Sequence, residues 1–99
     1  MLVEVVVAQG KKEHARAWAR VDGGAVVARG AGAPAETADV TFTATPADAQ
    51  ALHDGTLDLS VGYMRGQVKM AGDFGALLHL LPLTSGAAPA VPVTALLPD

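Results

Sequence analysis

Cysteine is absent from this chain of 99 residues, and aromatic residues make up only 4% of it. Without cysteine the protein forms no disulfide, no thiolate zinc site and no cysteine nucleophile, and it suits a reducing, cytoplasmic compartment. Seven basic and ten acidic residues leave a net charge of −3. Because nucleic-acid binders carry a basic surface, we expect no nucleic-acid partner.

Long uninterrupted apolar stretches are also missing. Residues 74–98 contain no Lys, Arg, Asp or Glu, but four prolines divide them. No piece therefore reaches the roughly 20 helical residues that a membrane span needs. The first residues lack the basic segment of a signal peptide. We expect a cytoplasmic protein without stable membrane insertion.

Side chains that carry catalytic chemistry are scattered along the chain. His14, His53 and His79 fall on three separate predicted elements and have no metal-ligand spacing. The carboxylates occur singly, and Ser60 and Ser85 lie outside any nucleophile motif. We therefore expect no enzyme activity, no catalytic or metal-binding residue and no cofactor.

Hydrophobic residues make up 51% of the chain, which is enough for the core of one small domain. Alternation of apolar and polar residues predicts strands over 2–8, 15–21, 25–29 and 39–44. They would form a meander of about four antiparallel strands. The alternation places Arg16, Trp18 and Arg20 together on one face of the second strand, as a solvated or partner-facing surface.

The second half of the chain begins with a helix signal. Thr45 and Pro46 are typical of a helix start, and Gly55 is placed to end a helix that runs to about His53. Residues 57–64 are ambiguous. Their alternation favours a strand, whereas Asp58 as a cap favours a short helix.

A further strand and a further helix follow. Residues 67–71 alternate as a strand, and the apolar spacing over 74–81 predicts an amphipathic helix that Pro82 ends. We take 1–83 as a single domain and 84–99 as an apolar, proline-rich tail. We expect the tail to dock on the core, because free ends are normally polar.

Several features follow one another in a distinctive order in this half. A strand opens with Ala-Asp at 38–39, a GTLD step at 55–58 ends a helix, and the stretch YMRGQVKMAGD at 63–73 precedes an apolar helix. In this order, residues 39–84 resemble the sterol-carrier-protein family of lipid-binding domains. Leu59 and Gly62 depart from it, since proline and alanine are usual there.

The resemblance implies an α+β fold. It would have an about five-stranded, mainly antiparallel sheet with two to three short helices packed on one face. It also implies that the ambiguous stretch is a short helix. The N-terminal helices of longer members would be missing, which makes this chain a trimmed member. Because their loss exposes apolar surface, we expect a symmetric homodimer.

In function, the resemblance implies a small intracellular carrier without covalent chemistry. A hydrophobic tunnel between the sheet and the C-terminal helices would take a sterol, fatty acid or acyl-CoA for lipid transfer. The candidate ligand-binding residues are Phe42, Leu52, Val61, Met64, Val68, Met70, Phe74, Leu77, Leu78 and Leu81. The alternative is that these residues form a core alone, in a dimerising structural or accessory module that has lost ligand binding.

Overall fold

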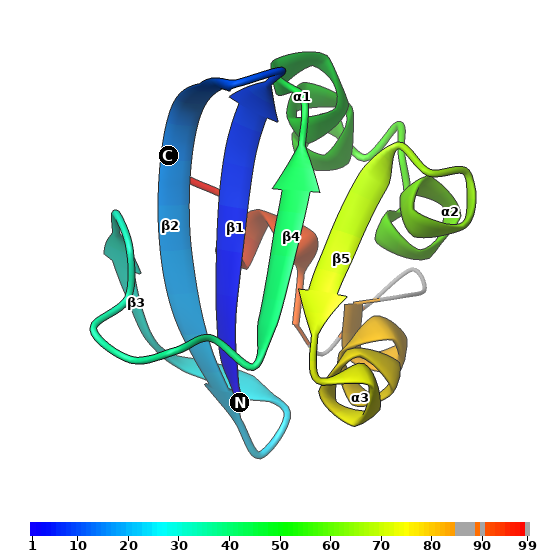
Figure 1. Cartoon of the computed structure of the whole chain (residues 1–99). Helices are drawn as coiled ribbons and strands as arrows, with labels where there is room; N and C mark the ends of the chain where they lie inside the picture. Colours follow the sequence, from blue (N-terminus) through cyan, green and yellow to red (C-terminus); the bar gives the residue numbers. More distant parts are fainter. Residues whose placement is uncertain (85–88, 90, 99) are drawn as a thin grey trace.

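A computed structural model describes residues 1–84, 89 and 91–98. It confirms the α+β fold: a five-stranded mixed, mostly antiparallel sheet carries three helices on one face (Figure 1). The order of strands across the sheet is β3-β2-β1-β4-β5. The strands are β1 (Leu2–Gln9), β2 (Lys12–Asp22), β3 (Ala25–Ala31), β4 (Val40–Ala44) and β5 (Val68–Gly72).

β4 corrects the predicted antiparallel meander of four strands, because it pairs in parallel with β1. After β3 the chain returns to the start of β1, where Asp39 N donates to Leu2 O over 2.8 Å and Leu2 N donates to Asp39 Oδ2 over 2.7 Å. These bonds place β4 beside β1. The most apolar strand thereby becomes the central one, buried on both faces, as is typical of strands in parallel pairing.

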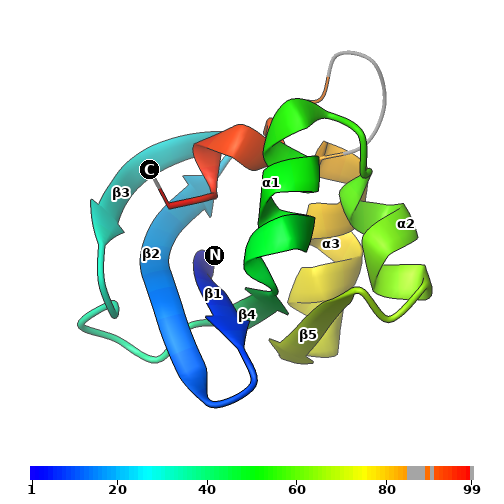
Figure 2. The ribbon, with the colours of Figure 1, turned by 90° about the horizontal axis from the view of Figure 1, so that it is seen from above.

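The register of the sheet confirms the predicted faces. Val3, Val5 and Val7 stand opposite alanines of β2, so these small side chains share one face. We call this the inner face, because all the helices lie on it (Figure 2). The outer face carries Glu4 and Arg16, and no helix covers it within the described residues (Figure 1).

Local capping sets the first two helices. α1 (Pro46–Asp54) begins after Thr45, whose Oγ1 accepts from Asp48 N over 3.2 Å, and ends at Gly55 with φ 80°. The ambiguous stretch is a helix, α2 (Leu59–Met64). The Asp58 carboxylate caps it by accepting the first free backbone N–H groups.

The third helix, α3 (Phe74–Thr84), is longer than predicted, because it passes through Pro82 instead of ending there. Inside a helix, proline removes one backbone hydrogen bond and clashes with the turn before it. The burial of Leu80 and Thr84, on either side of Pro82, outweighs this cost in stability. Thr84 Oγ1 also donates to Leu81 O over 3.0 Å and satisfies a carbonyl of the last turn. No helix of the described residues is long and apolar enough to cross a bilayer.

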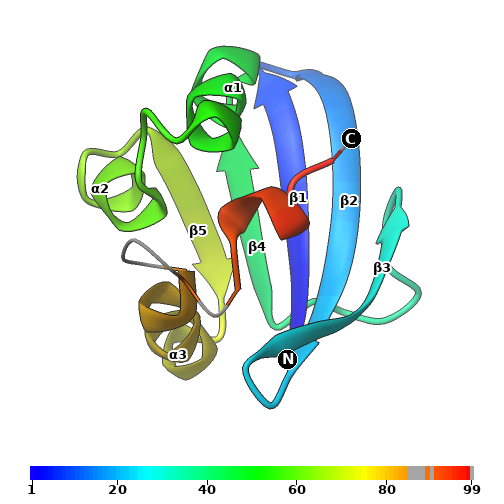
Figure 3. The ribbon, with the colours of Figure 1, turned by 180° about the vertical axis from the view of Figure 1, so that it is seen from behind.

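Residues from the expected tail lie in the core. Val91, Leu96 and Leu97 are only 0%, 1% and 5% exposed and belong to the same apolar cluster as the inner face. Between them a 3-10 turn, η1 (Val93–Ala95), crosses the inner face over β4 and β1 (Figure 3). Each fully buried side chain of this size contributes about 1.5–3 kcal/mol. Residues 85–88, 90 and 99 of that tail lie outside the described residues.

Candidate functional site

The inner face holds a cavity of about 360 Å³ under α1. Its floor is the end of β1 and the start of β2, and its far wall is formed by Thr94, Leu97 and Pro98. Apolar side chains predominate, with an amide, an imidazole and a hydroxyl among them. The lining residues are Val7, Ala15, Pro46, Ala49, Gln50, His53, Thr94, Leu97 and Pro98.

A second cavity of about 440 Å³ lies on the adjoining part of the inner face, between β2 and β3. Ala15 and Pro98 line both cavities, so the two are neighbours. Arg29 brings a positive charge to the second cavity, and its Nη2 donates to Leu97 O over 3.2 Å. The pair of cavities therefore offers apolar surface with a small number of polar groups, a composition typical of small-molecule sites.

The cavities contain no constellation for covalent or metal chemistry. Within residues 1–84, 89 and 91–98, no three His, Asp or Glu side chains gather to hold a metal ion. His53 is exposed, and its Nδ1 lies 3.6 Å from Asp54 Oδ1 at the end of α1. What the arrangement can do is take up an apolar group and hold a polar end beside Gln50 or Arg29.

The candidate ligand-binding residues from the sequence occupy two different environments. Six of them are brought together in or against the core: Phe42, Leu52, Val68 and Leu77 are buried, and Met70 and Leu81 pack beside them. The other four are between 39% and 82% exposed and lie on α2 and α3: Val61, Met64, Phe74 and Leu78. Of the ten, Leu52 lines a hollow of about 290 Å³ between the α1–α2 connection, Pro89 and residues 92–94.

Sequence reasoning missed the small residues of the two cavities. Ala15 and Ala17 alternate on β2, and Ala49 of α1 lines the first cavity together with Ala15. A run of alanines leaves space that leucine or phenylalanine would fill, so the signal was available in the alternation of residues 15–19. The contribution of residues 94–98 had no such local signal.

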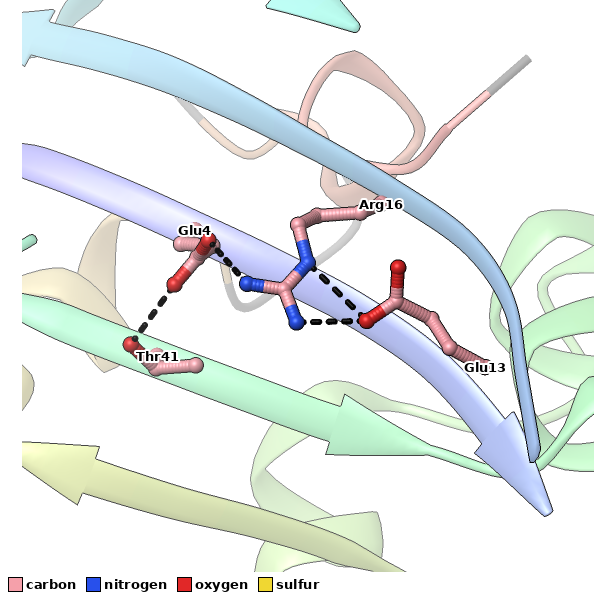
Figure 4. Close-up of polar contacts among 4 residues, drawn as sticks. All are labelled: Glu4, Glu13, Arg16 and Thr41. Carbon is pink, nitrogen blue, oxygen red and sulfur yellow. Dashed lines mark hydrogen bonds and ion pairs between the residues drawn. The ribbon is translucent and has the colours of Figure 1, made fainter. Parts of the chain in front are cut away.

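The outer face carries a cluster of paired charges (Figure 4). Arg16 donates to Glu4 Oε2 over 2.9 Å, and to Glu13 through both Nε and Nη2. Hydrogen bonds to Glu13 and then to Glu4 raise the pKa of Arg16 above its ordinary value. Thr41 Oγ1 donates to Glu4 Oε1 over 3.4 Å. These contacts join β1, β2 and β4. Because the guanidinium already pairs with two carboxylates, the cluster is poorly suited to hold an anion.

Several solved structures share the fold. Sterol carrier protein 2 from Yarrowia lipolytica, in its apo form, aligns with a TM-score of 0.60 and 16% identity, covering 81% of this chain and 62% of that chain. Palmitated sterol carrier protein 2-like 2 from Aedes aegypti aligns with a TM-score of 0.61 and 17% identity, covering 81% and 68%. This chain thus spans about two thirds of the length of these carriers.

A much larger enzyme contains the same fold. The inverting sec-alkylsulfatase from Pseudomonas sp. aligns with a TM-score of 0.58 and 24% identity, covering 90% of this chain and 13% of the enzyme. Identities at this level show a shared fold alone.

The sequence itself matches one known family. Comparison with the curated proteins found no match. The sequence pattern of the SCP-2 sterol transfer family, in contrast, matches residues 3–85, which are most of the chain and include the five strands, apart from the first residue of β1, and the three α-helices. With the sheet order, the helices on one face and the apolar inner face, this match confirms the resemblance: the chain belongs to the SCP-2 sterol transfer family.

Proposed function

We propose that the chain is a carrier domain that binds a lipid, with a fatty acid or sterol as the class of ligand, on the inner face of its sheet. The observation that carries the proposal is the cavity of about 360 Å³ between α1 and the sheet, which lies in the size range of small-molecule sites. The ligand would be held by burial and released unchanged, since the cavity walls offer no catalytic constellation.

The physical basis is the transfer of apolar surface out of water. Each methylene of a fatty chain contributes about 0.8 kcal/mol when it is buried, so about ten buried methylenes supply the roughly 8 kcal/mol of micromolar binding. Val7, Ala15 and Ala49 supply the apolar wall, and Gln50 stands among them as a hydrogen-bonding group for the polar end. The relative from Aedes aegypti is palmitated, which supports a fatty acid as the first probe.

Two alanines of α1 provide a matched test. Ala49 lines the cavity, whereas Ala47 is exposed on the same helix. We expect a pyrene-labelled fatty acid to bind the wild type with micromolar affinity. Ala49→Phe should fill the cavity and weaken binding at least about tenfold, and Ala47→Phe should bind as the wild type does. Circular dichroism melting of both variants checks that they remain folded.

The proposal fails if no saturable binding is found with fatty acids, sterols or acyl-CoA. The assignment of the ligand to the cavity under α1 fails if the two phenylalanine variants weaken binding equally. In that case the cavity under α1 is not the ligand site.

A dimerising or accessory module is the second candidate. Met64, Phe74 and Leu78 are exposed although they are large and apolar, which is typical of surfaces that meet a partner. The alkylsulfatase, in which this fold forms a small part of a larger enzyme, also favours an accessory role. Sedimentation equilibrium of the wild type and Leu78→Asp tests the dimer. A wild-type monomer at high micromolar concentration would contradict it.

A further inference from the structure

Residues 91–98, which we call the closing segment, pack into the core of the domain. They follow α3 and contain no charged side chain. Val91, Leu96 and Leu97 are among the least exposed side chains of the protein. They pack on the inner face with the core residues of β1, β2 and β4. The closing segment therefore fills space between the sheet and α1, the same layer in which we place the ligand.

Polar contacts hold the closing segment at its two ends. Val91 N donates to Leu83 O over 2.9 Å, which ties its beginning to the last turn of α3. Near its other end, Leu97 O accepts from Arg29 Nη2 over 3.2 Å, which ties it to β3. Between these points η1 packs against α1, and Figure 2 shows it beside that helix above the curved sheet. The closing segment is a strap across the inner face.

The two cavities lie beside this strap. Leu97 and Pro98 line the cavity of about 360 Å³, and Pro98 also lines the cavity of about 440 Å³. Ala15 of β2 borders both, so its small side chain adds no barrier between them. If Leu97 and Pro98 moved away from the sheet, the two spaces would join over β1, β2 and β3.

We propose that the closing segment occupies part of the ligand site, and that an apolar ligand binds by displacing Leu96 and Leu97 from the inner face. This inference rests on the proposed function. Because the ligand replaces leucine side chains with its own apolar surface, the inner face stays covered throughout the exchange. The apparent affinity is the intrinsic affinity multiplied by the fraction of molecules in which the strap is open, so ligands with little apolar surface, whose intrinsic affinity is low, bind poorly.

The absence of native cysteine allows a direct test. A single Leu96→Cys substitution places the only thiol of the protein in the closing segment, where its burial slows reaction with a thiol reagent. We expect oleate to raise the labelling rate about tenfold or more, because displacement exposes the segment. Leu80→Cys is the matched control, since Leu80 is equally buried but lies on α3, and its labelling rate should not rise with oleate.

A second variant measures the competition itself. Leu97→Ala weakens the strap without removing it, and we expect the pyrene-labelled fatty acid to bind it about fivefold to tenfold more tightly than the wild type. Val6→Ala truncates a buried residue of the outer face and should leave the affinity unchanged. Because both substitutions reduce packing, their comparison separates competition from a general loss of stability.

The outcomes separate the two proposals. If the fatty acid binds but labelling of Leu96→Cys stays constant or slows, the ligand does not displace the strap, and this inference is overturned while the proposed function stands. Equal acceleration at Leu80→Cys indicates general loosening of the fold and overturns it as well. If the fatty acid binds neither the wild type nor Leu97→Ala, the proposed function fails and takes the inference with it.

Discussion

The indole of Trp18 on β2 occupies the space where a side chain at Gly30 on β3 would lie. A Cβ atom built on Gly30 would be 2.7 Å from Trp18 Cε2, a distance that real Cβ atoms do not reach. The two residues are direct partners across the strands. Glycine at this position thus lets the only tryptophan pack closely against the edge strand.

Gly30→Ala is therefore expected to destabilise the protein by about 1–3 kcal/mol, the usual cost of forcing a well-packed side chain to move. The ring must turn away from β3, so the fluorescence of the single tryptophan should shift to longer wavelength. Urea unfolding followed by fluorescence measures both effects. Ala28→Ser, an exposed position on the same strand, is the control. An unchanged midpoint and spectrum for Gly30→Ala would contradict the packing.

Arg16→Ala should lower stability more than Arg20→Ala does. Arg16 pairs with Glu4, whose side chain is only 12% exposed, and its removal leaves that carboxylate with Thr41 as its hydrogen-bonding neighbour. Arg20 pairs with Glu36 on the open surface, where water replaces the lost partner. Urea midpoints compare the two variants, and equal midpoints would show that Glu4 remains adequately solvated.

Two leucines test how much the closing segment stabilises the core. Leu96 is 1% exposed, whereas Leu78 is 54% exposed on α3. Leu96→Ala should cost about 2–5 kcal/mol, the range for truncating a buried leucine. Leu78→Ala should stay within about 0.5 kcal/mol of the wild type, as surface substitutions do. Thermal and urea unfolding provide the values. Similar stabilities of the two variants would mean that the segment is not packed in solution.

The exposed residues of α2 and α3 make a further prediction about ligand binding. Met64 and Phe74 are candidate ligand-binding residues from the sequence, but they do not line either of the two cavities beside the closing segment. We expect Met64→Ala and Phe74→Ala to bind the pyrene-labelled fatty acid within about twofold of the wild type, because sites without contact act independently. A large loss of affinity would move the ligand site to these two helices.

Much of the local structure followed from the residues themselves. Alternation identified the faces of β1 and β2, and the cap at Thr45 began a helix where expected. The local pattern left residues 57–64 open between strand and helix, and the resemblance implied the helix that forms there. These features depend on neighbours a few residues apart, so the sequence displays them directly. The resemblance to the lipid-binding family, carried by an ordered set of short features, was confirmed as well.

Which of the candidate ligand-binding residues are buried and which are exposed could not be predicted in the same way. Helical spacing marks Leu77 and Leu78 alike as apolar positions of α3, but only Leu77 turns toward the sheet. Spacing gives the angle between side chains on a helix, not the direction from which the sheet approaches. Likewise, Pro82 weakens a helix locally, whereas the burial of residues on either side of it decides that α3 continues.

By itself, the sequence determined most of the strands, the start of α1 and the apolar spacing of α3, because backbone propensity and periodicity act over a few residues. Tertiary structure alone decided that β1 takes β4 as its parallel partner and that residues 91–98 cover the inner face. Arg29 and Leu97, joined by a hydrogen bond, lie 68 positions apart. Burial and cavity shape arise from such distant contacts, and an apolar residue is compatible with several of them until the whole chain is packed.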